Sequence, residues 1–271
     1  MIHTFRSSDG YEWRYRRYEP SQTPRGRIVY LHGIQSHGGW YTASSEYLAR
    51  AGYLVEFLDR RGSGLNQIAR GDAPSWMRLV DDISEFIRSG PKPIVMAVSW
   101  GGKLAAALEM RYPGSTHGLA LLTPGLRAQV RPPLLTRIRI GGAWMFAPWR
   151  TFPIPLDDPA LFTANPARQV YIRSDEQSLR RATARFLIES VRLDWALDRA
   201  TITVPVLLML AGRDRITDNL RTKEYAAKHF VGKTKLIEYG DASHTLEFEP
   251  NPSPIFADVA CWMESITPVV G

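Results

Sequence analysis

The chain has 271 residues, of which 44% are hydrophobic and 23% are charged, and its formal net charge is +7. This length and composition predict one large globular domain, with or without an insertion, and exclude an intrinsically disordered chain. The single cysteine, Cys261, excludes an intramolecular disulfide and a cysteine-based zinc or iron–sulfur site within one chain. Cys261 lies in an apolar run typical of a buried helix face, so we expect it in the core.

The amino terminus becomes polar within a few residues and contains no apolar run of the signal-peptide type. No stretch approaches the roughly 18 apolar residues that a membrane-spanning helix needs. We therefore expect a soluble, cytoplasmic protein.

The first predicted elements are two alternating runs, residues 2–7 and 11–18, separated by the hairpin signal Asp9-Gly10. Apolar strands then alternate with amphipathic helices as far as residue 122. Strands are predicted at residues 27–31, 53–58, 93–98 and 118–122, and helices at residues 40–51, 76–88 and 103–111. This alternation predicts a mostly parallel sheet with helices on both faces.

The alternation stops after residue 125 and returns at residue 204. The segment between contains no convincing strand and has helical spacing at residues 177–199. A strand at 204–210, a helix at 219–230, a strand at 235–239 and a helix at 254–266 then complete the pattern. We therefore predict one α/β domain, residues 1–125 and 203–271, interrupted by a mostly helical insertion, residues 126–202.

Ser99 stands between a buried apolar strand and a helix, in a small-x-Ser-x-Gly pattern formed with Ala97 and Gly101. A serine on such a turn is lifted above the sheet edge, and the positive end of the following helix points at it. The residues two before and two after the serine must be small, because the strained turn crowds them. Ala97 stands where the usual pattern has glycine. This context favours Ser99 as a catalytic nucleophile.

A serine hydroxyl needs a base within hydrogen-bond reach, and the base needs an acid that orients it. On a sheet of this kind the order along the chain is serine, acid, histidine. His244 follows the last strand and is the predicted base. Asp214 follows the strand before it and is the predicted acid, whereas Asp218 is better explained as a helix cap and Asp241 lies only three residues from His244.

An oxyanion hole requires two N–H groups aimed at the oxygen that becomes negative. One is expected from Trp100, directly after the nucleophile. The other is expected from the backbone of Ile34, in the loop after the strand at residues 27–31. His32 is expected to brace this loop.

The motifs together resemble the monoacylglycerol lipase and lysophospholipase group of the α/β-hydrolase superfamily. The resemblance rests on the Leu31-His32-Gly33 segment, on Asp59 to Gly64, on the elbow around Ser99, and on the acid and histidine segments. Trp100 stands where that group has methionine, and its bulk favours a short or flat acyl group. The resemblance implies an α/β-hydrolase fold with a Ser–His–Asp triad, and it is less specific for the substrate.

The resemblance also implies that residues 126–202 form a cap over the active site. From Arg127 to Arg199 this segment has 12 arginines, no lysine and seven acidic residues. Its apolar residues are expected mainly to pack the cap onto the sheet domain. Some could instead line a substrate pocket or touch a lipid surface. The candidate pocket residues are Trp144 and Phe146 of the cap and Trp40 of the oxyanion loop region.

The sequence therefore predicts an enzyme that cleaves carboxylic esters through an acyl-enzyme, with a monoacylglycerol or lysophospholipid as substrate. No cofactor, metal ion or nucleic acid is expected, and the oligomeric state is left open. A serine peptidase or amidase of the same fold is an alternative. So is a non-catalytic ligand-binding homologue. Dehalogenases and epoxide hydrolases share the fold but use an aspartate nucleophile, and Ser99 argues against them.

Overall fold

The computed structural model describes residues 1–266, and its centre is an eight-stranded sheet. The strand order is β1-β2-β4-β3-β5-β6-β9-β10. The strands are β1 (Ile2–Arg6), β2 (Glu12–Tyr18), β3 (Gly26–Leu31), β4 (Tyr53–Leu58), β5 (Ile94–Val98), β6 (Gly118–Leu122), β9 (Val206–Ala211) and β10 (Thr234–Tyr239). Only β2 runs antiparallel to its neighbours β1 and β4, and the remaining pairs are parallel. The predicted amino-terminal hairpin and mostly parallel sheet are confirmed.

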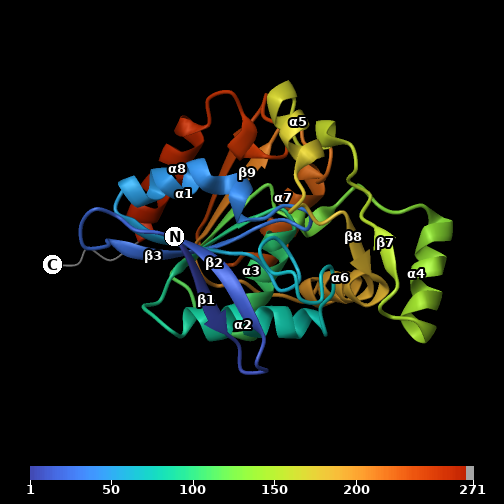
Figure 1. Cartoon of the computed structure of the whole chain (residues 1–271). Coiled ribbons are helices and arrows are strands. Elements are labelled where there is room, and N and C mark those ends of the chain that lie inside the picture. Colours follow the sequence, from blue (N-terminus) through green and yellow to red (C-terminus); the bar gives the residue numbers. More distant parts are fainter. Residues whose placement is uncertain (267–271) are drawn as a thin grey trace.

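Helices cover both faces of this sheet, as Figure 1 shows. On one face lie α1 (Thr42–Arg50) and α8 (Ser253–Ile266), which pack against each other. On the other face lie α2 (Trp76–Ile87) and α3 (Trp100–Arg111). The helix α7 (Asn219–His229) connects β9 to β10. The central strands are buried along their whole length because helices shield them on both sides.

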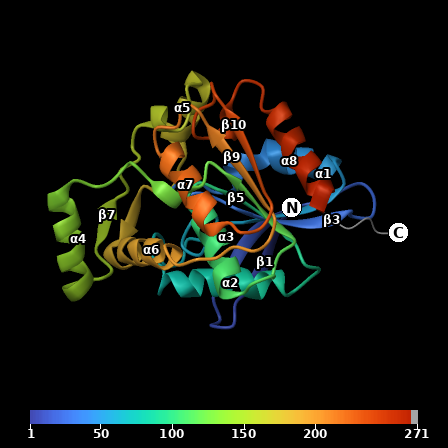
Figure 2. The ribbon, with the colours of Figure 1, turned by 180° about the vertical axis from the view of Figure 1, so that it is seen from behind.

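Between β6 and β9 the chain leaves the sheet, over a segment that contains the predicted insertion, residues 126–202. It contains α4 (Leu134–Phe146), α5 (Pro166–Ser174), α6 (Ala184–Leu197) and a two-stranded sheet of β7 (Thr151–Pro153) and β8 (Arg181–Thr183). The small sheet is a difference from the sequence prediction, which expected no strand here. In Figures 1 and 2, α4 is the outermost helix, and β7, β8 and α6 lie between it and the main sheet.

Cys261 is exposed, which contradicts the expectation that it lies in the core. The buried face of α8 is formed instead by Phe256, Val259, Trp262 and Met263. These spacings follow one side of a helix, and Cys261 falls outside that stripe. The helix is apolar over most of its circumference, so the sequence did not identify the face that turns outward. Within residues 1–266, no helix is both long and apolar enough to cross a lipid bilayer.

Candidate active site

Ser99 lies at the carboxyl end of β5 in a left-handed backbone conformation, with φ 52° and ψ −123°. A side chain in this region is strained, and such strain is concentrated at functional sites. The turn is possible because Gly101 lets α3 approach β3. A Cβ atom at Gly101 would lie 2.6 Å from the carbonyl oxygen of His32. The backbone N–H groups of Gly102 and Gly125 both donate to the carbonyl of Ser99 and hold the turn.

The structure brings Ser99, His244 and Asp214 into one hydrogen-bonded line. The Ser99 Oγ lies 2.9 Å from Nε2 of His244, and Nδ1 of the same ring lies 2.8 Å from Oδ2 of Asp214. Asp214 follows β9 and His244 follows β10, so the parallel strands deliver all three residues to the same sheet edge. The His244 and Asp214 side chains are almost fully buried.

Asp214 is fixed by several donors. Its Oδ1 accepts from the backbone N–H groups of Ile216 and Thr217, at 2.8 and 2.9 Å, and the Thr217 hydroxyl donates to Oδ2. Burial alone would raise the pKa of Asp214, but His244 and the bonds from Thr217 outweigh it and hold the pKa below its usual value. Asp214 is therefore a carboxylate, which suits a group that orients an imidazole.

The two rival acids lie in other environments. Asp218 is the N-cap of α7, and its carboxylate accepts from the backbone N–H of Arg221. Asp241 is exposed and pairs with Arg213. The ring of His244 hydrogen-bonds to Asp214 rather than to either of these two carboxylates.

Ile34 and Trp100 flank Ser99. A Cβ atom at Gly33 would lie 3.2 Å from Cβ of Ser99, so the Ile34 loop passes directly beside the serine. Among the described residues, the backbone N–H groups of Ile34 and Trp100 have no protein acceptor. The Trp100 N–H is at the first position of α3, where no intrahelical acceptor exists. Both groups are thus free to donate to a ligand.

The Trp100 side chain packs against residues 126–202. Its Nε1 donates to the hydroxyl of Ser190 on α6, at 2.8 Å, and its ring lies against Phe186 of the same helix. The indole therefore anchors α6 to the turn after Ser99.

The three candidate pocket residues occupy different environments. Trp40 is buried and packs against Phe162 and Phe248. Trp144 and Phe146 lie on the outermost helix, α4, where Phe146 is 82% exposed and the Trp144 ring lies under Arg192. Their apolar surface faces outward, so the structure does not place Trp144 and Phe146 in a pocket. The sequence pattern could not separate the inner from the outer side of this apolar helix.

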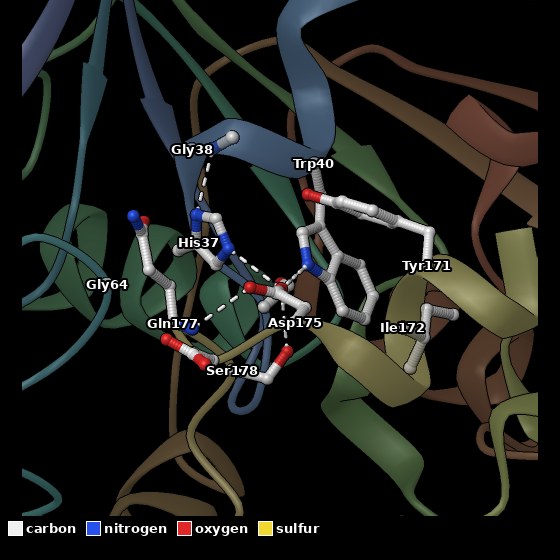
Figure 3. Close-up of polar contacts among 12 residues, drawn as sticks. His37, Gly38, Trp40, Gly64, Tyr171, Ile172, Asp175, Gln177 and Ser178 are labelled. Carbon is white, nitrogen blue, oxygen red and sulfur yellow. Dashed lines mark hydrogen bonds and ion pairs between the residues drawn. The ribbon is translucent and has the colours of Figure 1, made fainter.

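Figure 3 shows a polar cluster that joins residues 126–202 to the loop near Ile34. Oδ2 of Asp175 lies 2.9 Å from Nε2 of His37 and accepts from Nε1 of Trp40, at 2.6 Å, and from the Ser178 hydroxyl, at 2.8 Å. The backbone N–H of Leu179 donates to the carbonyl of Gln35. Burial alone would raise the pKa of Asp175, but the His37 and Trp40 contacts lower it below its usual value.

Two further residues that fix the site were not predicted from the sequence. Asp175 lies in the loop between α5 and β8 and has no local pattern that marks it. Thr123 has a positive φ of 41° directly after β6, and its hydroxyl donates to the carbonyl of His244, at 2.8 Å. The position of Thr123 at the carboxyl end of a central strand was an available signal. Within residues 1–266, no group of three or more His, Cys, Asp or Glu side chains could hold a metal ion.

An eight-stranded, mostly parallel sheet with a serine on the strained turn after β5 defines the α/β-hydrolase class. The profile of the serine aminopeptidase S33 family, Hydrolase_4, matches residues 22–251, and the chain belongs to this family of hydrolases. The predicted fold class is therefore confirmed.

Individual relatives agree with the resemblance predicted from the motifs. The chain is 26% identical over 275 residues to a monoacylglycerol lipase of Mycolicibacterium smegmatis, covering 97% of this chain and 96% of that protein. It is 25% identical over 249 residues to the phospholipase YtpA of Bacillus subtilis, covering 86% and 93%. A solved Paleococcus ferrophilus monoacylglycerol lipase superposes with a TM-score of 0.84 at 24% identity, covering 94% and 99%. The last similarity supports the fold.

Proposed function

We propose that the protein hydrolyses carboxylic esters through a covalent acyl-enzyme on Ser99. The observation that carries this proposal is the unbroken line of contacts from the Ser99 hydroxyl through His244 to Asp214. His244 takes the Ser99 proton as the hydroxyl attacks the ester carbonyl, and later gives a proton to the leaving alcohol. The N–H groups of Ile34 and Trp100 stabilise the oxyanion. Water then releases the acid and restores Ser99.

Asp214 has an orienting and electrostatic role in this scheme. Its contact with Nδ1 of His244 leaves Nε2 free to accept the proton from Ser99. When His244 becomes positively charged, the adjacent carboxylate stabilises that charge. His244 and the hydrogen bonds from Thr217 keep the pKa of Asp214 below its usual value. Asp214 therefore stays ionised in every step of this scheme.

The favoured substrate is a monoacylglycerol or lysophospholipid, presented by a lipid surface to the segment 126–202. Support comes from the relatives named above and from the exposure of large apolar side chains on and after α4. Leu134, Ile138, Met145, Phe146 and Trp149 are each at least 63% exposed. Exposed arginines stand beside them, and this pairing suits an anionic lipid surface. Residues 126–202 would then act as the cap over the site.

The first experiment compares Ser99→Ala with the unaltered protein on p-nitrophenyl esters of increasing chain length. The expected result is loss of turnover in the variant for every ester, and the chain length that the unaltered protein prefers measures the size of its acyl site. Undiminished turnover by Ser99→Ala would refute the assignment of the nucleophile.

Amide hydrolysis is the second candidate activity, because the family to which the chain belongs is named after a serine aminopeptidase. The same three side chains can cleave an amide if the leaving amine is protonated. A panel of aminoacyl coumarinyl amides separates the two activities. The ester proposal predicts turnover of these amides that is at least 100-fold slower than that of the best ester.

A further inference from the structure

Arg60 lies directly behind the loop that carries Ile34, and no step described above uses it. It follows β4 at the same sheet edge as Ser99, and the residue is 8% exposed. Its Nη1 donates to the carbonyl oxygen of Gly33, at 3.2 Å, and its Nη2 donates to that of Ile34, at 3.0 Å. The guanidinium therefore holds two consecutive carbonyls of this loop.

The contact with Gly33 bears directly on the Ile34 N–H, because both groups belong to the same peptide unit. The chain has no cis peptide bond among the described residues, so this carbonyl and this N–H point in opposite directions. A donor that fixes the Gly33 carbonyl therefore turns the Ile34 N–H away from Arg60. Hydrogen bonding at the carbonyl also polarises the peptide and strengthens the N–H as a donor.

His32 completes this arrangement. Its Nε2 accepts from the backbone N–H of Arg60, at 2.9 Å, which assigns the proton of the neutral ring to Nδ1. Nδ1 then donates to the same Gly33 carbonyl, at 2.7 Å. Burial, together with the charge of Arg60, lowers the pKa of His32 well below its usual value and keeps the ring neutral. Two donors, the Arg60 guanidinium and the His32 ring that the Arg60 backbone N–H orients, thus converge on one carbonyl oxygen.

Arg60 also contacts the second candidate oxyanion residue. Its guanidinium carbon lies 4.9 Å from the ring centre of Trp100 and 5.2 Å from that of Phe186. Such contacts between a cation and aromatic rings are attractive, and more so when water is excluded. Arg60 therefore packs on Trp100 as well as on the Ile34 loop.

The charge of Arg60 is not matched by a contacting carboxylate within residues 1–266. Its neighbour Arg61 pairs with Asp82 and Asp9, and Asp59 pairs with Arg16. Burial lowers the pKa of Arg60 to about 9, so it remains charged at neutral pH. A buried cation without a carboxylate partner is costly, and carbonyls and rings offset that cost only in part. Asp59, the preceding residue, attracts Arg60 electrostatically but forms its ion pair with Arg16. Arg60 thus places a positive charge that has no contacting carboxylate beside the site where negative charge would develop.

We propose that Arg60 is a positioning residue that orients and polarises the Gly33–Ile34 peptide and thereby sets the strength of the oxyanion hole. The inference rests on the proposed ester hydrolysis through Ser99. It assigns Arg60 an effect on the transition state, with little effect on ester binding, because the oxyanion exists only after Ser99 has attacked.

The test uses Arg60→Met, Arg60→Lys and a matched control, Arg27→Lys. Arg27 is also buried, also donates to backbone carbonyls and also stacks on a ring, that of Phe86. It lies at the amino end of β3, opposite the edge that carries Ser99. The measurements are kcat and KM for p-nitrophenyl octanoate, thermal unfolding, and the affinities of 1,1,1-trifluorodecan-2-one and the matching alcohol. The ketone forms an oxyanion on reaction with the serine, and the alcohol cannot.

For Arg60→Met we expect kcat to fall about 10- to 100-fold with KM nearly unchanged, since loss of a whole oxyanion donor costs about 10²–10³. Ketone affinity should fall by a similar factor while alcohol affinity is retained. Arg60→Lys keeps the charge and one hydrogen bond, so its kcat and ketone affinity should lie between those of Arg60→Met and those of the unaltered protein. Arg27→Lys should lower the melting temperature and leave kcat within about twofold.

The inference would be overturned if kcat of Arg60→Met stayed within twofold of that of the unaltered protein. It would also be overturned if the variant lost ketone affinity and alcohol affinity equally. If Arg60→Met does not fold, the ratio of ketone affinity to alcohol affinity is compared between Arg60→Lys and the unaltered protein. A lower ratio in Arg60→Lys supports the inference, and an unchanged ratio overturns it. An unaltered protein that hydrolyses esters, with Ser99→Ala inactive and Arg60→Met unaffected, would refute only the role of Arg60. An unaltered protein inactive on every ester would refute the proposed function itself.

Discussion

At the scale of single residues, the acid of the proposed triad is the choice that the sequence left most open. Three aspartates, 214, 218 and 241, lie within a short distance of His244 along the chain or across the sheet. The structure separates them by their contacts. Asp214 contacts a ring nitrogen of His244, Asp218 caps a helix N-terminus, and Asp241 pairs with an exposed arginine. Each contact implies a different consequence of removing the charge.

Asp214→Asn is expected to lower kcat by about 10⁴, because an amide would favour the wrong tautomer of His244. Asp218→Asn and Asp241→Asn are matched controls, and both should keep kcat within about threefold, since asparagine caps a helix as well as aspartate. Steady-state kinetics on one p-nitrophenyl ester, with circular dichroism to verify folding, measures all three. A large loss in either control with Asp214→Asn active would reassign the acid.

Glu247 is a buried carboxylate without a contacting cation among the described residues, and it predicts a pH dependence of stability. Burial raises its pKa from 4.5 to about 7, although the backbone N–H of Ser44 donates to it at 2.9 Å. The folded protein therefore holds a proton that the unfolded chain releases between these pH values. The stability that this proton contributes is complete below pH 4.5 and is lost as the pH rises through about 7.

Glu247→Gln should remove this dependence. Relative to the unaltered protein, the variant should gain stability as the pH rises from 5 to 8, by about 3 kcal/mol at most. Thermal unfolding of both proteins at several pH values gives the difference directly. Two parallel curves of melting temperature against pH would contradict the assignment.

The candidate site residues that the sequence predicted are those whose proposed roles depend on position along the chain. Ser99, Asp214 and His244 each follow a strong apolar strand, and parallel strands bring such positions to one edge. Arg60 and Asp175 act through contacts with residues distant in sequence. A basic residue after β4 looks the same in sequence whether it points into solvent or behind a loop. The three-dimensional contacts were needed to distinguish these cases.

At the scale of elements, the sheet strands and most helices were predictable because a buried strand and an amphipathic helix each leave a strong apolar pattern. The β7–β8 pair was missed for physical reasons. Each strand has three residues, Pro153 lies within the pair, and the paired residues, such as Phe152 and Ala182, are far apart in the chain. Its stability comes from packing against α6, which no local pattern reveals.

The Asp175 cluster connects two elements, and its removal should loosen both. In Figure 3 the Asp175 carboxylate joins the loop before β8 to His37 and Trp40 beside the candidate oxyanion loop. Asp175→Ala leaves the Trp40 N–H without its acceptor, which costs free energy in a buried site. We expect faster amide hydrogen exchange in residues 33–41 and 175–180, and a lower melting temperature.

An exposed aspartate of the same segment, Asp157, provides the matched control for this measurement. Asp157→Ala should leave exchange in both regions unchanged. If Asp175→Ala accelerates exchange only in residues 175–180, the cluster does not couple the two elements. Faster exchange in both regions would support a connection between residues 126–202 and the candidate oxyanion loop.

At the scale of the whole molecule, the exposed apolar surface is distributed unevenly. Many of the large exposed hydrophobic side chains lie between Leu134 and Trp149, on the outermost helix and the turn after it. This end of the molecule extends away from the main sheet in both Figures 1 and 2. Exposed apolar patches on this scale mark interaction surfaces.

Replacing Phe146 and Trp149 together by serine should weaken co-sedimentation with phosphatidylglycerol vesicles about tenfold or more. Turnover of a short water-soluble ester should be unchanged, because neither residue contacts the triad. Ile68→Ser is the matched control, since Ile68 is 68% exposed on a different surface. Equal vesicle binding by the double variant and the unaltered protein would refute the lipid-facing role of α4.

The account as a whole depends on Ser99 being the side chain that becomes acylated. The most direct measurement is to label the intact protein with a fluorophosphonate and to locate the adduct by peptide mass spectrometry. One stoichiometric adduct is expected on the peptide that contains Ser99. This adduct should be absent from Ser99→Ala and strongly reduced in His244→Ala. Labelling of a different residue while Ser99 stays unmodified would contradict it.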